Sequence, residues 1–190
     1  MLKSVQNMAT RLHTSSDNTV RLEAVKYHAE KAATLDEYQA GVADGQRRLS
    51  AQYENLSSDC QASKFALIGF SQGAQVVHEF AHSLNAGQAH NLVLVAMIAD
   101  PRRNPDDTIA AWAYAAEPAP GKLGAGPRFS PSTRHKAITF CAALDEVCNR
   151  PGASQPNGMS ITHKKLYEKA STIRSTGRQL AAVLQRNGVG

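Results

Sequence analysis

The amino-acid sequence predicts an α/β fold in which a central parallel sheet lies between two layers of helices. Two short apolar runs, at residues 65–68 and 92–99, are typical of strands that are buried on both faces. Segments with apolar residues at helical spacing alternate with these runs, which favours parallel strands joined by helices. The length of 190 residues is that of one domain, so we expect a single domain over residues 1–190.

The first part of the chain predicts three elements before the first buried strand. Residues 2–12 place apolar side chains at helical spacing and predict an opening helix. Residues 20–29 alternate apolar and polar side chains at first, which predicts a strand near an edge of the sheet. Residues 38–56 predict a second helix, and glycines at 41 and 45 weaken its start.

The second part of the chain contains a long irregular stretch and two further elements. Residues 101–134 hold six of the eight prolines and predict a surface excursion, with a short helix at 108–116. Residues 136–141 predict another strand, and a loop rich in Pro, Gly and Asn follows at 149–160. A final helix is predicted at 164–187, where apolar residues again recur at helical spacing.

Composition excludes several classes of function. Hydrophobic residues at 42% and charged residues at 19% are ordinary for a globular protein, and no apolar run reaches membrane-spanning length. The net charge of +5 comes with basic doublets that are scattered along the chain, so we expect no nucleic-acid partner. The N-terminal stretch lacks the apolar core of a signal peptide.

Residues 69–73 read Gly-Phe-Ser-Gln-Gly and follow the first buried strand directly. They fit G-x-S-x-G, a sharp turn between a strand and a helix that lifts a serine hydroxyl above the sheet edge. We expect Gly69 and Gly73 to leave room for close passage of the strand and the helix. Ser71 is then the candidate nucleophile, and the backbone N–H of Gln72 is the candidate donor to the anion formed on attack.

Two further polar residues are expected at the same edge of the sheet as Ser71. Asp145 follows the predicted strand at 136–141, and His163 precedes the last predicted helix. The carboxyl ends of parallel strands carry the functional groups of such folds. Serine, aspartate and histidine also occur in the chain order of an α/β-hydrolase triad.

These motifs resemble the cutinase family. Residues 69–74 are similar to its G-Y-S-Q-G-A elbow, residues 141–148 resemble its C-x-x-G-D-x-V-C segment, and His163 with Tyr167 resembles its H-x-x-x-Y. The likeness covers roughly residues 2–187, and weaker echoes are Val25–Ala29 and Asp100-Pro101.

The resemblance implies a serine esterase of the α/β-hydrolase fold that acts without a cofactor or a metal. Ser71 would attack an ester carbonyl, His163 would relay the proton, and Asp145 would stabilise the imidazolium. A disulfide between Cys141 and Cys148 would fix the aspartate, the alternative being two reduced thiols. The substrate would be a cutin-like polyester, a lipid or a short-chain ester. We expect a secreted monomer.

The chain departs from the family pattern at several places. Leu144 and Ala99 stand where the family has glycines, which puts the local turn geometry in question. The family's first strand and its oxyanion loop have no counterpart in the sequence, and Cys60 matches a family cysteine whose partner lies in that segment. We therefore expect a truncated front end that has also lost any export signal, an open seam beside the elbow strand, and a free Cys60. A catalytically impaired binding module is the resulting alternative.

A competing motif lies on the helix after the elbow. His78, Glu79 and His82 form H-E-x-x-H, which on a helix places two imidazoles on one face for zinc, with the glutamate as base. This would make the chain a zinc metallopeptidase. The simpler interpretation is that these residues and Gln75 form the polar outer face of an amphipathic helix.

Overall fold

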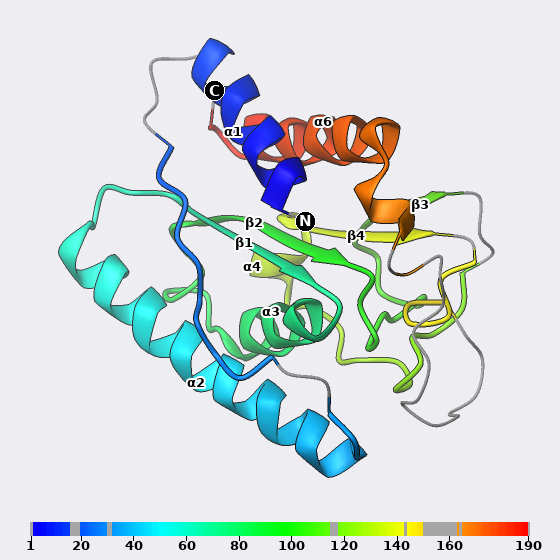
Figure 1. The fold of residues 1–190 in the computed structure, drawn as a ribbon. Helices are drawn as coiled ribbons and strands as arrows, with labels where there is room; N and C mark the ends of the chain where they lie inside the picture. The colour runs from blue at the N-terminus through cyan, green and yellow to red at the C-terminus, as the bar shows by residue number, and fades with distance from the viewer. Residues whose placement is uncertain are drawn as a thin grey trace.

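The computed structural model describes residues 2–15, 20–29, 32–114, 118–142, 144–149, 163 and 165–189. The elements are α1 (Leu2–Ser15), α2 (Leu35–Asp59), β1 (Phe65–Phe70), α3 (Gln72–Ser83), β2 (Leu92–Ile98), β3 (Ala110–Tyr114), α4 (Pro131–Arg134), β4 (Ala137–Ala142), η1 (Leu166–Glu168) and α6 (Ala170–Arg186). The predicted fold class is confirmed: a parallel sheet has α1 and α6 on one face and α2 and α3 on the other (Figure 1).

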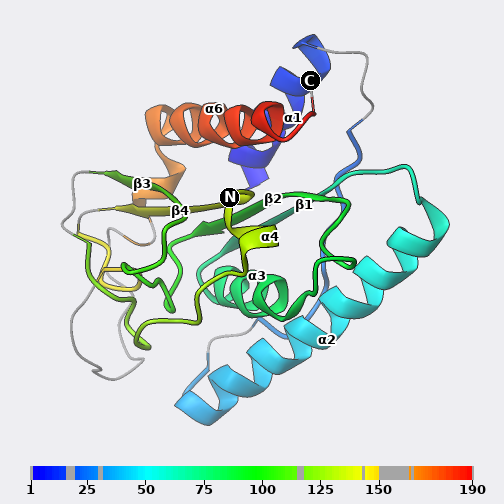
Figure 2. The same cartoon turned by 180° about the vertical axis from the view of Figure 1, so that it is seen from behind.

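The sheet has four strands in the order β1-β2-β4-β3, and each neighbouring pair is parallel. Phe70 pairs with Ile98, which in turn pairs with Phe140, so these three strands end at the same edge. The loops that follow the strands gather at that edge, as the view from behind also shows (Figure 2). Among the described residues β1 pairs with β2 alone, so its other edge carries no strand partner there.

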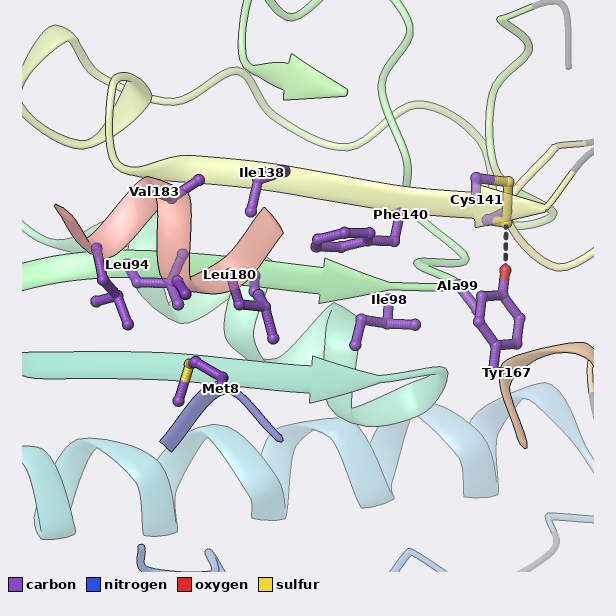
Figure 3. Close-up of a cluster of buried hydrophobic side chains, with 14 of the residues drawn as sticks. Met8, Leu94, Ile98, Ala99, Ile138, Phe140, Cys141, Tyr167, Leu180 and Val183 are labelled. Atoms are coloured by element: carbon purple, nitrogen blue, oxygen red, sulfur yellow. Dashed lines mark hydrogen bonds between the residues drawn. A yellow bond between two sulfur atoms is a disulfide. The ribbon is translucent and has the colours of Figure 1, made fainter. Parts of the chain in front are cut away.

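Two clusters of buried apolar side chains fill the spaces between the layers. One lies between the sheet and the pair α1 and α6, where Met8 and Leu180 meet Ile98 and Phe140 (Figure 3). The other lies between the sheet and α2 and α3. Every residue of β2 is buried because both faces of this central strand are covered, which is why its sequence is a continuous apolar run.

The helix α2 begins earlier than its apolar pattern predicts because it has a capping box. The backbone N–H of Glu37 donates to Oγ1 of Thr34 at 3.1 Å, and the Glu37 carboxylate accepts from the Thr34 backbone N–H. Gly45 allows α2 to approach α3 closely, since a Cβ there would lie 2.7 Å from a methyl group of Val76. Its place in the helix therefore has a packing reason that offsets its low helix propensity.

The prediction of a strand at residues 20–29 is wrong. The segment is extended but makes no ladder, and its partly buried Val25 and Tyr27 pack on the cluster formed with α2 and α3. An alternating pattern requires only one buried side, and the surface of two helices supplies that side as well as a sheet does.

The prediction of a helix at residues 108–116 is also wrong. Residues 110–114 form β3, which pairs with β4 along its whole length, Ala110 with Ile138 and Tyr114 with Ala142. The alanines favour a helix locally, but pairing with an exposed strand edge decides the structure of so short a segment. Residues 150–162, which include most of the loop predicted at 149–160, lie outside the described residues. No helix in the described part of the chain combines the length and apolarity needed to cross a bilayer.

Candidate active site

Ser71 stands at the turn between β1 and α3 with backbone angles of φ 56° and ψ −121°. A positive φ is unusual for a residue with a side chain and costs about 1–3 kcal/mol, so the surroundings must hold it. The backbone N–H of Ser71 donates to the carbonyl of Ile98 at 2.9 Å, and its own carbonyl accepts from the N–H of Ala74. The turn is thus fixed to β2 on one side and to the first turn of α3 on the other.

The structure brings Ser71, His163 and Asp145 together at the carboxyl edge of the sheet. Nε2 of His163 lies 3.0 Å from Oγ of Ser71, and Nδ1 lies 3.0 Å from Oδ2 of Asp145. The imidazole and the carboxylate are 1% and 0% exposed, while Ser71 is partly accessible. An ionised carboxylate only accepts hydrogen bonds, so Nδ1 of His163 carries a proton and Nε2 presents its lone pair to the serine hydroxyl.

The carboxylate of Asp145 is held by two further donors. The backbone N–H of Val147 donates to Oδ1 at 3.0 Å, and the hydroxyl of Tyr167 donates to Oδ2 at 2.9 Å. The Tyr167 hydroxyl itself accepts from the N–H of Ala142 at 3.0 Å, which ties it to the end of β4. Both oxygens of the buried carboxylate therefore accept from donors.

The predicted disulfide between Cys141 and Cys148 is confirmed. It closes the loop that carries Asp145, and the sulfur of Cys148 lies 3.7 Å from the Tyr167 hydroxyl (Figure 3). Cys60 is free, as expected.

Two residues support this site in ways that the sequence patterns do not specify. Tyr167 is visible in the sequence only as part of a motif, and its bond to Asp145 depends on how η1 lies against β4. The ring of Phe70 stacks on the imidazole of His163, with centroids 5.0 Å apart and an angle of 22° between the planes. The sequence contains one signal for Phe70, which is its position directly before the serine of the G-x-S-x-G motif.

The two glycines of the elbow have different roles. A Cβ on Gly69 would lie 2.0 Å from the carbonyl oxygen of Gly73, so a side chain at this position is sterically excluded. A Cβ on Gly73 would meet only the Tyr27 hydroxyl, at an ordinary 3.5 Å. The expectation that both glycines provide room for close passage is therefore correct for Gly69 and wrong for Gly73.

The backbone N–H of Gln72 belongs to the first turn of α3, where N–H groups have no preceding helical carbonyl to bond. The positive end of the helix dipole lies at the same place. The Gln72 side chain points to α2 and donates to the carbonyl of Tyr38 at 3.1 Å. Gln72 thus contacts α2 through its side chain, while its backbone N–H lies at the start of α3, directly after Ser71.

The H-E-x-x-H residues do not form a metal centre. Both ring nitrogens of His78 have protein partners: Nδ1 lies 2.6 Å from Oδ2 of Asp100 and Nε2 lies 2.9 Å from the carbonyl of Pro127. Within the described residues no group of three or more His, Cys, Asp or Glu side chains is placed to hold a metal. The simpler interpretation also fails in part, because Gln75 and His78 are 1% and 2% exposed and lie inside the protein.

The two positions where the family pattern has glycine behave differently. Ala99 keeps the positive φ that a glycine would adopt readily, at 57°, and is fully buried. Its backbone N–H donates to the carbonyl of Phe140 at 2.8 Å, which fixes the strained turn. Leu144 is 77% exposed beside Asp145, so its side chain is accommodated in solvent.

The fold is that of cutinase-like α/β hydrolases. A family model for Cutinase matches residues 2–175, and the chain belongs to the cutinase family. Carboxylesterase Culp1 from Mycobacterium tuberculosis (strain ATCC 25618 / H37Rv) is 25% identical over 134 residues, which are 70% of this chain and 54% of the relative. The same values hold for Carboxylesterase Culp1 from Mycobacterium bovis, so the chain spans about half the length of these relatives.

Solved structures share the fold at low sequence identity. A cutinase-like protein from Cryptococcus sp. has a TM-score of 0.75 at 15% identity, covering 99% of this chain and 87% of that one. The catalytic core domain of acetyl xylan esterase from Trichoderma reesei has a TM-score of 0.71 at 20% identity, covering 97% and 90%.

Proposed function

We propose that this chain is a serine carboxylic ester hydrolase that uses Ser71, His163 and Asp145 as its catalytic residues. The observation that carries the proposal is the continuous chain of contacts from Oγ of Ser71 through His163 to Asp145. Membership of the cutinase family and the likeness to a protein named carboxylesterase support the same class of reaction.

The geometry suits acyl transfer through a covalent intermediate. Oγ of Ser71 attacks the ester carbonyl carbon while Nε2 of His163 takes the hydroxyl proton, and Asp145 stabilises the imidazolium. The tetrahedral intermediate then expels the alcohol, which receives that proton, and an acyl-serine remains. Water, activated by the same imidazole, attacks the acyl carbon, and the acid leaves as the serine hydroxyl is restored.

The anion formed in each tetrahedral intermediate needs a donor close to the attacking oxygen. The N–H of Gln72 follows the nucleophile directly and lies at the positive end of α3, so we assign it this role. Donors of this kind typically contribute about a 100- to 1000-fold effect on turnover.

The proposal extends to the class of substrate and to the location of the enzyme. The ester would be a cutin-like polyester, a lipid or a small ester, and the catalyst would act as a monomer outside the cell. The disulfide supports an oxidising location, since such bonds persist mainly in extracellular compartments.

Hydrolysis of a short-chain p-nitrophenyl ester tests the proposal. Ser71→Ala is expected to lower turnover by at least about 1000-fold, because the nucleophile is lost and only binding and oxyanion effects remain. Ser83→Ala on the same helix is the control, since the Ser83 hydroxyl donates to the carbonyl of Phe80 at 2.7 Å. A metal chelator should leave turnover unchanged. Unaltered turnover in Ser71→Ala would refute the proposal, and a folded protein without turnover would favour a binding module.

A further inference from the structure

A second buried histidine–aspartate pair connects α3 with the chain that follows β2. His78 belongs to α3, the helix that starts at the turn of Ser71, and Asp100 follows β2, whose Ile98 carbonyl accepts the Ser71 N–H. The two side chains are 2% and 1% exposed, with Nδ1 of His78 2.6 Å from Oδ2 of Asp100. Neither residue takes part in the proposed reaction.

Both partners of His78 accept hydrogen bonds. One is the carboxylate of Asp100, whose other oxygen accepts from the N–H of Arg102 at 2.9 Å, and one is the carbonyl of Pro127 at 2.9 Å. A neutral imidazole has one N–H and would place a lone pair against an oxygen at the other contact. Against an ionised carboxylate, only the doubly protonated ring satisfies both contacts.

The charges around His78 favour this cation. Burial alone would lower the pKa of His78, but the hydrogen bond and charge of Asp100 and the Pro127 carbonyl outweigh burial and raise it. Asp107 adds to the increase, while Arg103 lines the same small cavity with the opposite sign. From α2, Tyr38 faces Asp100 with a raised pKa, for which burial is the first cause.

The chain around Pro127 passes very close to the imidazole. The ring of Phe129 stacks on His78 with centroids 4.9 Å apart, and a Cβ on Gly126 would lie 2.7 Å from Cε1 of His78. Gly126 also donates its N–H to the carbonyl of Arg102 at 2.7 Å. His78 therefore holds residues 118–129, the returning part of the excursion, against α3.

The same returning segment supports the loop of the proposed catalytic acid. The N–H of Lys122 donates to the carbonyl of Val147 at 2.9 Å, and the N–H of Val147 donates to Oδ1 of Asp145 at 3.0 Å. On the other side of the loop, Asn149 accepts from the N–H of Ala119 at 2.9 Å. Residues 122–127 of this segment thus connect His78 with the loop that carries Asp145.

We propose that His78 is a positioning residue of the proposed active site: as a cation it fixes residues 118–129 to α3, and these residues hold the loop that carries Asp145. The inference rests on the proposed function for its effect on turnover. Because the folded state raises the pKa of His78, this stabilisation is complete below the ordinary histidine range and is lost as pH rises through the raised pKa.

The Asp100→Asn variant tests the charge of His78 separately from its hydrogen bonds. The asparagine oxygen can still accept from Arg102, and its amide can donate to Nδ1 of a neutral His78, whose Nε2–H then donates to Pro127. This variant is expected to keep the segment in place at all pH values at which the imidazole is neutral. His78→Phe keeps an aromatic ring against Phe129 but removes both hydrogen bonds, and should lower kcat/KM by at least roughly tenfold, the equivalent of one lost hydrogen bond.

Nitrogen-15 spectra of the histidines, recorded at about pH 7.5, provide the direct test because an ordinary histidine is mainly neutral there. Both ring nitrogens of His78 should be protonated in the wild type, and one should lose its proton in Asp100→Asn. Amide protection at Gly126 should fall in wild type as pH rises, and stay constant in Asp100→Asn after correction for intrinsic exchange. The control is His90→Phe, a replacement of an exposed histidine between α3 and β2, because His82 also contacts the segment, with Nδ1 3.0 Å from the carbonyl of Arg128.

The outcomes separate this inference from the proposed function. A neutral His78 in an active wild-type enzyme, or unchanged kcat/KM in a folded His78→Phe, would overturn the inference. Loss of turnover in His90→Phe equal to that in His78→Phe would overturn it as well. A doubly protonated His78 in a folded protein without esterase turnover would overturn the proposed function instead.

Discussion

Replacing the two elbow glycines by alanine should affect stability to very different extents, which gives a sharp test of the turn geometry. In Gly69→Ala the new Cβ would lie 2.0 Å from the carbonyl oxygen of Gly73 and 2.7 Å from Cα of Ala74. These are backbone atoms, so the strand and the helix must separate. The cost should be at the upper end of overpacking, about 3 kcal/mol. In Gly73→Ala the methyl group meets the Tyr27 hydroxyl at 3.5 Å, an ordinary contact.

Thermal unfolding followed by circular dichroism measures the difference. One kcal/mol corresponds to roughly 2–4 °C in a chain of this size, so Gly69→Ala should lower Tm by about 6–12 °C. Gly73→Ala should lie within about 2 °C of wild type, since alanine is the better helix former. Equal Tm values for the two variants, or a Gly73→Ala protein that is the less stable, would refute the assignment of the steric role to Gly69 alone.

Three further predictions concern the supports of the site. Tyr167→Phe keeps the ring but removes a hydrogen bond to a charged group, so kcat/KM should fall about tenfold with little change in KM; an unchanged rate would contradict the positioning role. Ala99→Gly removes the strain of a positive φ, whereas Ala81→Gly, the control, places a glycine in a buried helix. In urea unfolding, the loss in free energy of unfolding should therefore be about 2 kcal/mol smaller for Ala99→Gly than for Ala81→Gly. Reduction of the Cys141–Cys148 disulfide should destabilise the protein by about 2–3 kcal/mol, the chain-entropy value for so small a loop, and should lower turnover with it. A reduced protein with the same Tm and turnover would contradict that support.

The sequence patterns predict the elements that are buried on both faces and those that occupy special turns. The run at 92–98 is a central strand because only a strand covered on both sides can be apolar throughout. Ser71, Asp145 and His163 could be placed at one edge because parallel strands bring their carboxyl ends together. Such features follow from local sequence patterns and from the order of strands and helices along the chain, so they can be predicted without the structure.

Other features depend on which surface a segment meets in space. Residues 20–29 and 110–114 each have patterns that fit more than one environment, and the partner decided between them. His78 has the sequence context of a solvated helix face, yet the return of the chain at Pro127 encloses it. The bond from Tyr167 to Asp145 likewise requires knowledge of where η1 lies. Long-range contacts of this kind have no signature in local spacing.

Labelling by an active-site-directed fluorophosphonate tests most directly whether Ser71, His163 and Asp145 form a working catalytic unit. Such a probe forms a covalent bond only with a serine whose hydroxyl is activated by a base. Peptide mass spectrometry should locate the adduct at Ser71, with labelling abolished in Ser71→Ala and strongly slowed in His163→Ala. An adduct on another serine, or labelling of Ser71 at the same rate without His163, would contradict the proposed mechanism.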